Sequence, residues 1–221
     1  MDWFPFWLSL KVALLATGLG FLLALLAAWA LSYLRFRGRE VLDALITLPL
    51  VLPPTVLGYY LLVLVGRNTL PGQAYEAVFG SPLVFTWHAA VVAALVHTVP
   101  LLTKFIRASL ESVDPVFIKS ARSLGIAEWR IFLLIVLPMA RRSLLAALVL
   151  AFARSLGDFG VTIMIAGNIP GQTQTLSVAI YQAVESGDAA LARGMVLLLS
   201  LFGFLVVWLA NRFNPPHPSV A

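Results

Sequence analysis

Four long apolar stretches of this sequence contain no Asp, Glu, Lys or Arg. They are Val12 to Leu34, Ala44 to Gly66, Leu83 to Thr103 and Gly194 to Ala210. A helix needs about 20 apolar residues to cross about 30 Å of hydrocarbon, and in that medium it satisfies its own backbone hydrogen bonds. A fifth run reaches this length only if it includes Arg154 and Asp158. We therefore expect an all-α membrane protein with five transmembrane helices, at about 10–34, 44–66, 83–104, 143–165 and 191–210.

The composition agrees with a membrane protein and argues against several other classes. Hydrophobic residues make up 61% of the chain and charged residues 11%, whereas about a quarter of a soluble domain is charged. The net charge of +5 does not indicate nucleic-acid binding, because the basic residues lie between the apolar runs. The sequence has no Cys, its His residues are scattered, and it has no GxxxxGK[ST], GxGxxG, HExxH or GxSxG motif. We expect one transmembrane domain over 1–221 with no catalytic residues, no metal site and no ATP site.

The basic residues give an orientation for the predicted spans. Arg35, Arg37 and Arg39 follow the first run. The segment after the third run holds Lys104, Arg107, Lys119, Arg122, Arg130, Arg141 and Arg142. Short loops rich in Lys and Arg stay on the cytoplasmic side of a membrane. We therefore expect the N-terminus outside, the C-terminus in the cytoplasm and a cytoplasmic loop at about 105–142.

This loop has the signals of a short helix followed by a turn. Asp114 and Pro115 suit the first positions of a helix, since Asp accepts hydrogen bonds from free N–H groups and Pro has none to leave unpaired. Gly125 suits a left-handed residue at the helix end. A second helix would run from about residue 127 until Pro138 interrupts it. The residues alone leave two interpretations open: a helix that docks on a soluble partner, or a surface helix held on anionic lipid.

A family resemblance favours docking. Ala121, Gly125, Ile135, Leu137 and Pro138 match the spacing of the EAA signature of ABC importer permeases, E-A-A-x3-G-x9-I-x-L-P, while Lys119 and Ser120 replace its first two residues. The resemblance implies that the loop 114–138 is a coupling helix held in a cleft of a cytoplasmic ATPase. The implied coupling residues are Phe117, Lys119, Ser120, Ala121, Arg122, Leu124, Gly125, Glu128, Arg130, Ile135, Leu137 and Pro138.

Three further segments resemble molybdate ABC transporter permeases. They are "LPLVLPPTVLGYYLLVLVGR", "AFARSLGDFG" and "GNIPGQTQTLSVAIY". This resemblance implies the type I ABC importer permease fold, a bacterial inner-membrane location and inward transport of molybdate or tungstate by alternating access. It also implies a homodimer with two ATPase subunits, which bind ATP and Mg, and an extracytoplasmic molybdate-binding protein. By this resemblance, the chain itself would not be an enzyme and would bind no cofactor.

The sequence leaves alternatives to this function open. The same machine could carry sulfate or another oxyanion. An intramembrane enzyme would need a nucleophile and a base, for which His97 and Ser155 are the candidate pair, and a scaffold would need neither transport nor an ATPase. Asp158 is a departure from the Glu that is more usual in the molybdate family.

Polar and proline residues within the apolar runs predict the translocation pathway. Pro53 and Pro54 break the second run, and non-helical backbone at membrane depth must face protein or water. Arg154 and Asp158 are four residues apart, on one face of a helix, where a lone charge costs at least about 2.5 kcal/mol. They either form an ion pair that fixes packing or line the path of the anion together with Ser155.

Overall fold

The structure is a computed structural model that describes residues 2–34 and 36–213. Within these ranges the chain is helical and has no strand. The first half contains α1 (Phe4–Tyr33), α2 (Arg39–Thr47), η1 (Leu48–Leu50), α3 (Pro54–Val65), α4 (Leu70–Phe79) and α5 (Trp87–Glu111). The second half contains α6 (Pro115–Ser123), α7 (Glu128–Ile131), η2 (Phe132–Val136), α8 (Leu137–Leu156), α9 (Gly160–Ile165), α10 (Leu176–Glu185) and α11 (Ala189–Phe213).

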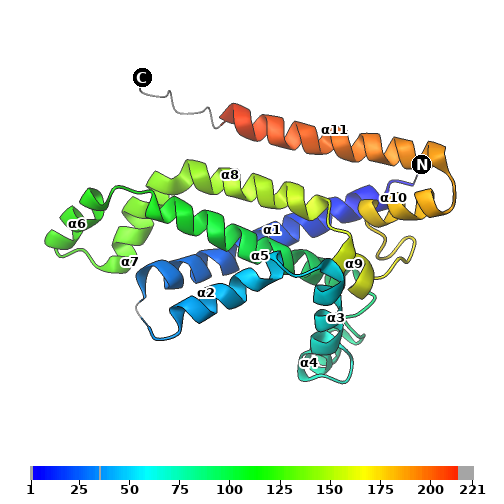
Figure 1. Cartoon of the computed structure of the whole chain (residues 1–221), viewed down its shortest axis with the longest axis horizontal. Helices are drawn as coiled ribbons and strands as arrows, with labels where there is room; N and C mark the ends of the chain where they lie inside the picture. The colour runs from blue at the N-terminus through cyan, green and yellow to red at the C-terminus, as the bar shows by residue number, and fades with distance from the viewer. Residues whose placement is uncertain (1, 35, 214–221) are drawn as a thin grey trace.

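The long helices α1, α5 and α8 run side by side and form the centre of the molecule (Figure 1). Small residues make up the contact between them. Ala16, Ala24 and Ala28 of α1 are fully buried, whereas Leu22 and Leu26 of the same helix are exposed. Alanine inside and leucine outside is the pattern of helices that pack closely in lipid, where leucine gains nothing from leaving the hydrocarbon.

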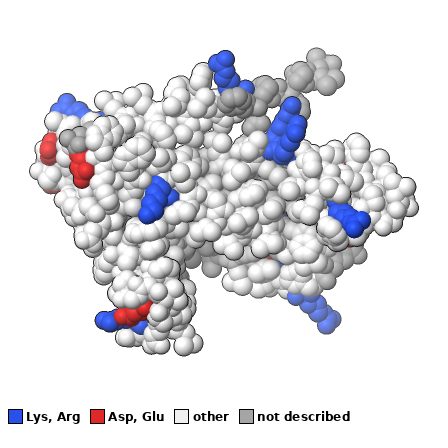
Figure 2. All heavy atoms as spheres, turned by 180° about the vertical axis from the view of Figure 1, so that it is seen from behind, with Lys and Arg blue, Asp and Glu red and all other residues white. Residues whose placement is uncertain are grey.

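Several helices are long and apolar enough to cross a membrane. They are α1, α5, the continuous helix formed by α7, η2 and α8, and α11, and the bent pair of α2–η1 with α3 would make a fifth span. The face seen in Figure 2 is mostly uncharged, with isolated Lys and Arg side chains. The all-α membrane fold is thus confirmed, while the predicted span limits and the orientation stay predictions.

The second predicted span is not a straight helix. Residues 39–50 and α3 meet at a bend of 113°. Pro53 is the N-cap of α3 and Pro54 is its first residue, which is where proline is tolerated because no intrahelical N–H bond is lost. The predicted break at these prolines is confirmed.

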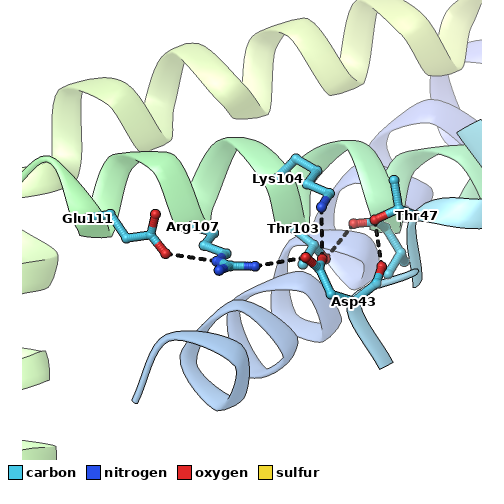
Figure 3. A network of polar contacts seen from close by, with 7 residues as sticks. Asp43, Thr47, Thr103, Lys104, Arg107 and Glu111 are labelled. Atoms are coloured by element: carbon cyan, nitrogen blue, oxygen red, sulfur yellow. Dashed lines mark hydrogen bonds and ion pairs between the residues drawn. The ribbon is translucent and has the colours of Figure 1, made fainter. Parts of the chain in front are cut away.

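An ion-pair network holds α2 against α5 (Figure 3). The carboxylate of Asp43 accepts hydrogen bonds from Lys104 Nζ at 2.8 Å and from Arg107 Nη1 at 2.9 Å. Arg107 Nε also donates to Glu111 at 2.8 Å. One carboxylate on the short helix therefore contacts two cations on the long one, which fixes the position of the first half of the bent pair.

Pro138 does not interrupt the second helix of the loop, which corrects the sequence prediction. The helix runs without a break from Glu128 to Leu156, and residues 132–136, just before the proline, form the π-helical turn η2. A proline in an α-helix removes one hydrogen bond and its ring clashes with the carbonyl four residues earlier. The wider π turn ends at this point, so the ring is accommodated without breaking the helix.

Candidate functional site

The predicted coupling segment forms one end of the molecule. In Figure 1, α6 and α7 lie opposite the end that holds α10 and the N-terminus of α1. Asp114 caps α6 by accepting a hydrogen bond from the Val116 N–H at 2.8 Å, and Pro115 is the first helical residue. The helix start predicted from the Asp-Pro pair is therefore confirmed.

Gly125 closes α6 in the left-handed conformation, with φ of +73°. Its N–H donates to the Arg122 carbonyl at 3.0 Å, and the Ile126 N–H donates to the Ala121 carbonyl at 3.2 Å. This pair of bonds is the Schellman motif, which satisfies the free carbonyls at the end of a helix. The left-handed glycine predicted at this position is confirmed.

The two short helices are joined by packing and by an ion pair. Ala121 is buried in the same apolar cluster as Ile131 and Phe132. Arg122 Nη2 donates to Glu128 Oε2 at 3.0 Å, and Arg122 Nε donates to the other carboxylate oxygen. The hydrogen bond from Arg122 lowers the pKa of the exposed Glu128 carboxyl below its ordinary value. The α6–α7 corner is thus held by an apolar contact on the inside and a bidentate ion pair on the outside.

The corner presents apolar side chains to its surroundings. Phe117 is 49% exposed, Leu124 is 79% exposed, and Trp129 is also exposed. Apolar residues at the tip of a polar segment, away from the long apolar helices, are typical of a surface that contacts another protein. Ser120 and Arg130 are exposed beside them.

The remaining predicted coupling residues lie in the long helix that follows. Ile135 is in η2, and Leu137 and Pro138 begin α8. Ile135 and Leu137 are partly buried against the apolar core. The structure therefore places Ile135 and Leu137 as support of the corner, whereas Pro138 is exposed at the start of α8 and away from the tip.

A second group of polar residues lies where α8 ends. Asp158 follows the last residue of α8, Leu156, and precedes α9, so it does not share a helix face with Arg154 as predicted. Gly157 and Asp158 are poor helix formers, and the Asp158 carboxylate instead accepts a hydrogen bond from Thr162 Oγ1 of α9 at 2.6 Å.

The contacts of Asp158 with charged groups are longer. Arg154 Nη1 lies 3.9 Å and His97 Nδ1 lies 3.7 Å from the same carboxylate oxygen. The Asp158 side chain is 7% exposed, whereas that of Arg154 is 46% exposed. Arg154 therefore forms only a long ion pair with the buried carboxylate, and nearly half of its side chain is exposed.

Ser155 is occupied by a different partner. Its hydroxyl shares a hydrogen bond of 2.8 Å with Thr98 Oγ1 of α5, and both residues are buried. The pair that an intramembrane enzyme would need is not formed, because His97 faces Asp158 and makes no hydrogen bond through Nδ1 to the described residues. In this conformation Ser155 joins two helices and does not line an open path.

The two breaks in the long helices meet at this point. A Cβ on Gly160, two residues after Asp158, would lie 2.6 Å from the Pro54 side chain. The start of α9 thus packs directly on the start of α3, beside Pro53. The structure brings the two prolines close to the turn that holds Asp158. Thr162 and Thr98 belong to this group but were not predicted, since hydroxyl residues in apolar helices give no distinctive sequence signal.

Comparison with known proteins shows that both the sequence and the fold are similar to those of membrane subunits of transport systems. Residues 20–216 match the family model described as binding-protein-dependent transport system inner membrane component. The chain is 41% identical over 215 residues to the molybdenum transport system permease protein ModB of Escherichia coli strain K12, covering 95% of this chain and 94% of that protein. It is 34% identical over 231 residues to the sulfate transport system permease protein CysT of the same strain, covering 97% and 83%.

A solved structure has a similar fold. The inward-facing methionine ABC transporter MetNI has a chain that superposes with a TM-score of 0.76 at 18% identity, and the match covers 97% of this chain and 96% of that one.

Proposed function

The chain belongs to the family of binding-protein-dependent transport system inner membrane components, and on that premise we propose that it is the permease subunit of a molybdate importer. It is a multi-pass membrane protein with the fold of ABC importer permeases. Molybdate, or the similar anion tungstate, would cross at the interface of two copies of this subunit by alternating access.

The observation that carries the choice of substrate is the sequence relationship. Identity to a molybdenum permease is 41% over nearly the whole of both chains, against 34% to a sulfate permease that this chain covers less completely. Sulfate remains the second candidate because that relationship also extends over 97% of the chain.

The α6–α7 corner is the proposed contact with a separate ATPase. Phe117 and Leu124 would enter a cleft of that subunit as apolar anchors, with Glu128 and Arg130 beside them. The hydrogen-bonded turn at Gly125, which ends α6, supports this role, because a coupling helix must stay folded while it transmits movement between subunits. ATP and Mg would be bound by the ATPase, and this chain would hold neither.

The complete importer would contain two copies of this chain. α11 supports this proposal, since only 11% of its most apolar stretch is buried within one chain, which leaves an apolar face for lipid or a second copy. Two ATPase subunits would bind the two α6–α7 corners, and an extracytoplasmic binding protein would deliver the anion at the opposite end. Closure of the ATPase pair would move the two corners together, and the membrane helices would convert this movement into alternating access at the interface of the two copies.

Arg154 is the proposed anion contact of the pathway. Its side chain is half exposed although its neighbour Asp158 is buried, so it offers donors to a dianion that must lose part of its water. Pro53, Pro54 and Asp158 would shape the same region, and Ser155 would join it only if its bond to α5 opens. The Arg154→Gln variant should insert normally and lose most uptake, while Arg193→Gln, which removes the same charge elsewhere, should keep it. Wild-type uptake by Arg154→Gln would remove Arg154 from the pathway.

The function is tested most directly by ATP hydrolysis of the reconstituted complex with its binding protein. Titration with molybdate and tungstate should stimulate hydrolysis, and sulfate at the same concentrations should not. Stimulation by sulfate alone would overturn the molybdate assignment. Absence of any copurifying ATPase would overturn the importer itself.

A further inference from the structure

A basic pocket lies under α6, between that helix and the adjoining ends of α1 and α2. Its volume is about 320 Å³. Ser32, Tyr33, Arg39, Ile118, Lys119 and Arg122 line it. Three cations therefore converge on one small space, and none of the described lining residues is Asp or Glu.

These cations are only partly neutralised by the described part of the chain. Arg39 and Lys119 form no ion pair with any described residue. Arg122 uses Nε and Nη2 for Glu128, which leaves Nη1 without a carboxylate. Like charges that share a pocket repel one another unless an anion lies between them. Among the described residues, Arg39, Lys119 and one nitrogen of Arg122 therefore lack a negative partner, while Glu128 neutralises part of the charge of Arg122.

Two neutral features of the pocket also suit an anion. Ser32 lines the pocket, and its Oγ is buried without a hydrogen-bond partner among the described residues. α2 begins at Arg39, on the wall of the pocket, and its N-terminus has no side-chain cap. The free N–H groups of a helix N-terminus carry partial positive charge and attract negatively charged groups.

The position of the pocket indicates where the anion comes from. It adjoins the last turn of α1, a helix apolar enough to cross a membrane, and Tyr33 and Ile118 give it an apolar wall. A helix that crosses a bilayer has its last turn near the headgroups, and basic pockets between membrane helices bind anionic headgroups. We propose that this pocket binds the phosphate group of an anionic phospholipid, with Arg39, Lys119 and Arg122 as its cationic contacts.

The lipid would bind on a different side of α6 from the proposed ATPase contact. Lys119 and Arg122 are three residues apart and share one face, whereas Phe117 and Leu124 lie about half a turn away. One short helix could therefore hold a lipid toward the membrane and a protein on its outer face. The inference does not depend on which anion is transported or on which subunits bind the corner.

Native mass spectrometry of the full-length chain in detergent tests the proposal. The probes are short-chain phosphatidylglycerol, which is anionic, and phosphatidylcholine with the same acyl chains. We expect phosphatidylglycerol to be retained in preference. Lys119→Gln and Arg39→Gln should each weaken its apparent affinity about fivefold, the usual effect of one basic residue near an anionic headgroup. Arg142→Gln removes a charge from the same end of the molecule, outside the pocket, and should change the affinity less than twofold.

Three results would overturn the proposal. Equal weakening by Arg142→Gln would mean that the charge of the whole surface attracts the lipid. Equal retention of the two lipids would show that the pocket does not recognise the net negative charge of the headgroup. Displacement of phosphatidylglycerol by millimolar inorganic phosphate, with the same dependence on Lys119, would assign the pocket to a free oxyanion. Each variant should elute and unfold as the unmodified chain does, which separates a lost site from a lost fold.

Discussion

Replacing Gly125 by valine strains one turn and removes no contact. The residue sits at φ of +73°, and a Cβ added there would meet no atom within 4 Å. The cost is therefore conformational. The left-handed conformation costs an L-residue about 1–2 kcal/mol, and a β-branched side chain is an outlier there. A penalty of this size shifts the balance between the closed and the opened turn by about five- to thirtyfold.

The assay is a comparison of uptake with ATP hydrolysis in the reconstituted importer. If the turn transmits motion, Gly125→Val should insert and assemble but lose uptake, while hydrolysis continues and no longer responds to substrate. Gly125→Asn should be mild, because asparagine tolerates the left-handed conformation, and Gly125→Ala should fall between. Gly80 is the matched control, since it has φ of +72°, equally open space and a place at the end of α4.

Two outcomes would refute this reasoning. Uptake by Gly125→Val at the wild-type rate would show that the closed turn is not needed for coupling. An equal loss in Gly80→Val would show that strain anywhere in the chain lowers activity, so the effect would not be specific to α6.

Three further predictions concern other parts of the structure. Arg122 lowers the pKa of Glu128 in the folded protein, so this ion pair stabilises the corner at neutral pH, and its contribution is lost as pH falls through the lowered pKa. Hydrogen exchange of α6, corrected for intrinsic rates, should therefore become faster on acidification. The Glu128→Gln variant should lose this pH dependence. Thr162→Val leaves a buried carboxylate without its 2.6 Å hydrogen bond and should destabilise the protein by about 1–3 kcal/mol, measured by thermal unfolding against Ser at the same position, which keeps the hydroxyl. Gly20→Val would place a Cβ 2.9 Å from a methyl group of α5 and should lower the free energy of unfolding by about 1–3 kcal/mol. Gly18→Val is the control: its Cβ meets nothing within 4 Å, so this variant should insert and unfold as the original chain does.

Local signals explain why the corner was predictable. Asp114, Pro115 and Gly125 act through backbone groups one to four residues away, so their pattern is visible in the sequence and the structure confirms it. Uncharged runs are visible for the same reason, since each helix in lipid must bond its own backbone. The bend at Pro53 and Pro54 follows from the geometry of the proline ring.

Contacts between distant segments were not predictable. Thr98 and Ser155 are 57 residues apart in the sequence, and Asp43 and Lys104 are 61 apart. The sequence of one segment does not indicate which residue of the other it will contact, because the contact forms only when the helices pack. Asp158 bonds Thr162 only four residues further on, but this contact was also missed, because a hydroxyl residue in an apolar helix gives no distinctive sequence signal.

The π turn η2 also sets an angle. A π turn holds one residue more than the α-helical turn it replaces, and each residue of an α-helix advances the side chains by about 100°. The residues before η2 are therefore rotated by about that amount relative to an unbroken helix entering α8. If residues 132–136 became α-helical with no residue removed, the whole α6–α7 corner would turn by more than a quarter of a circle, whereas deleting one of these residues would restore a plain helix and keep the direction of the corner. The direction in which the exposed tip points, relative to the membrane helices, thus depends on η2 absorbing one extra residue.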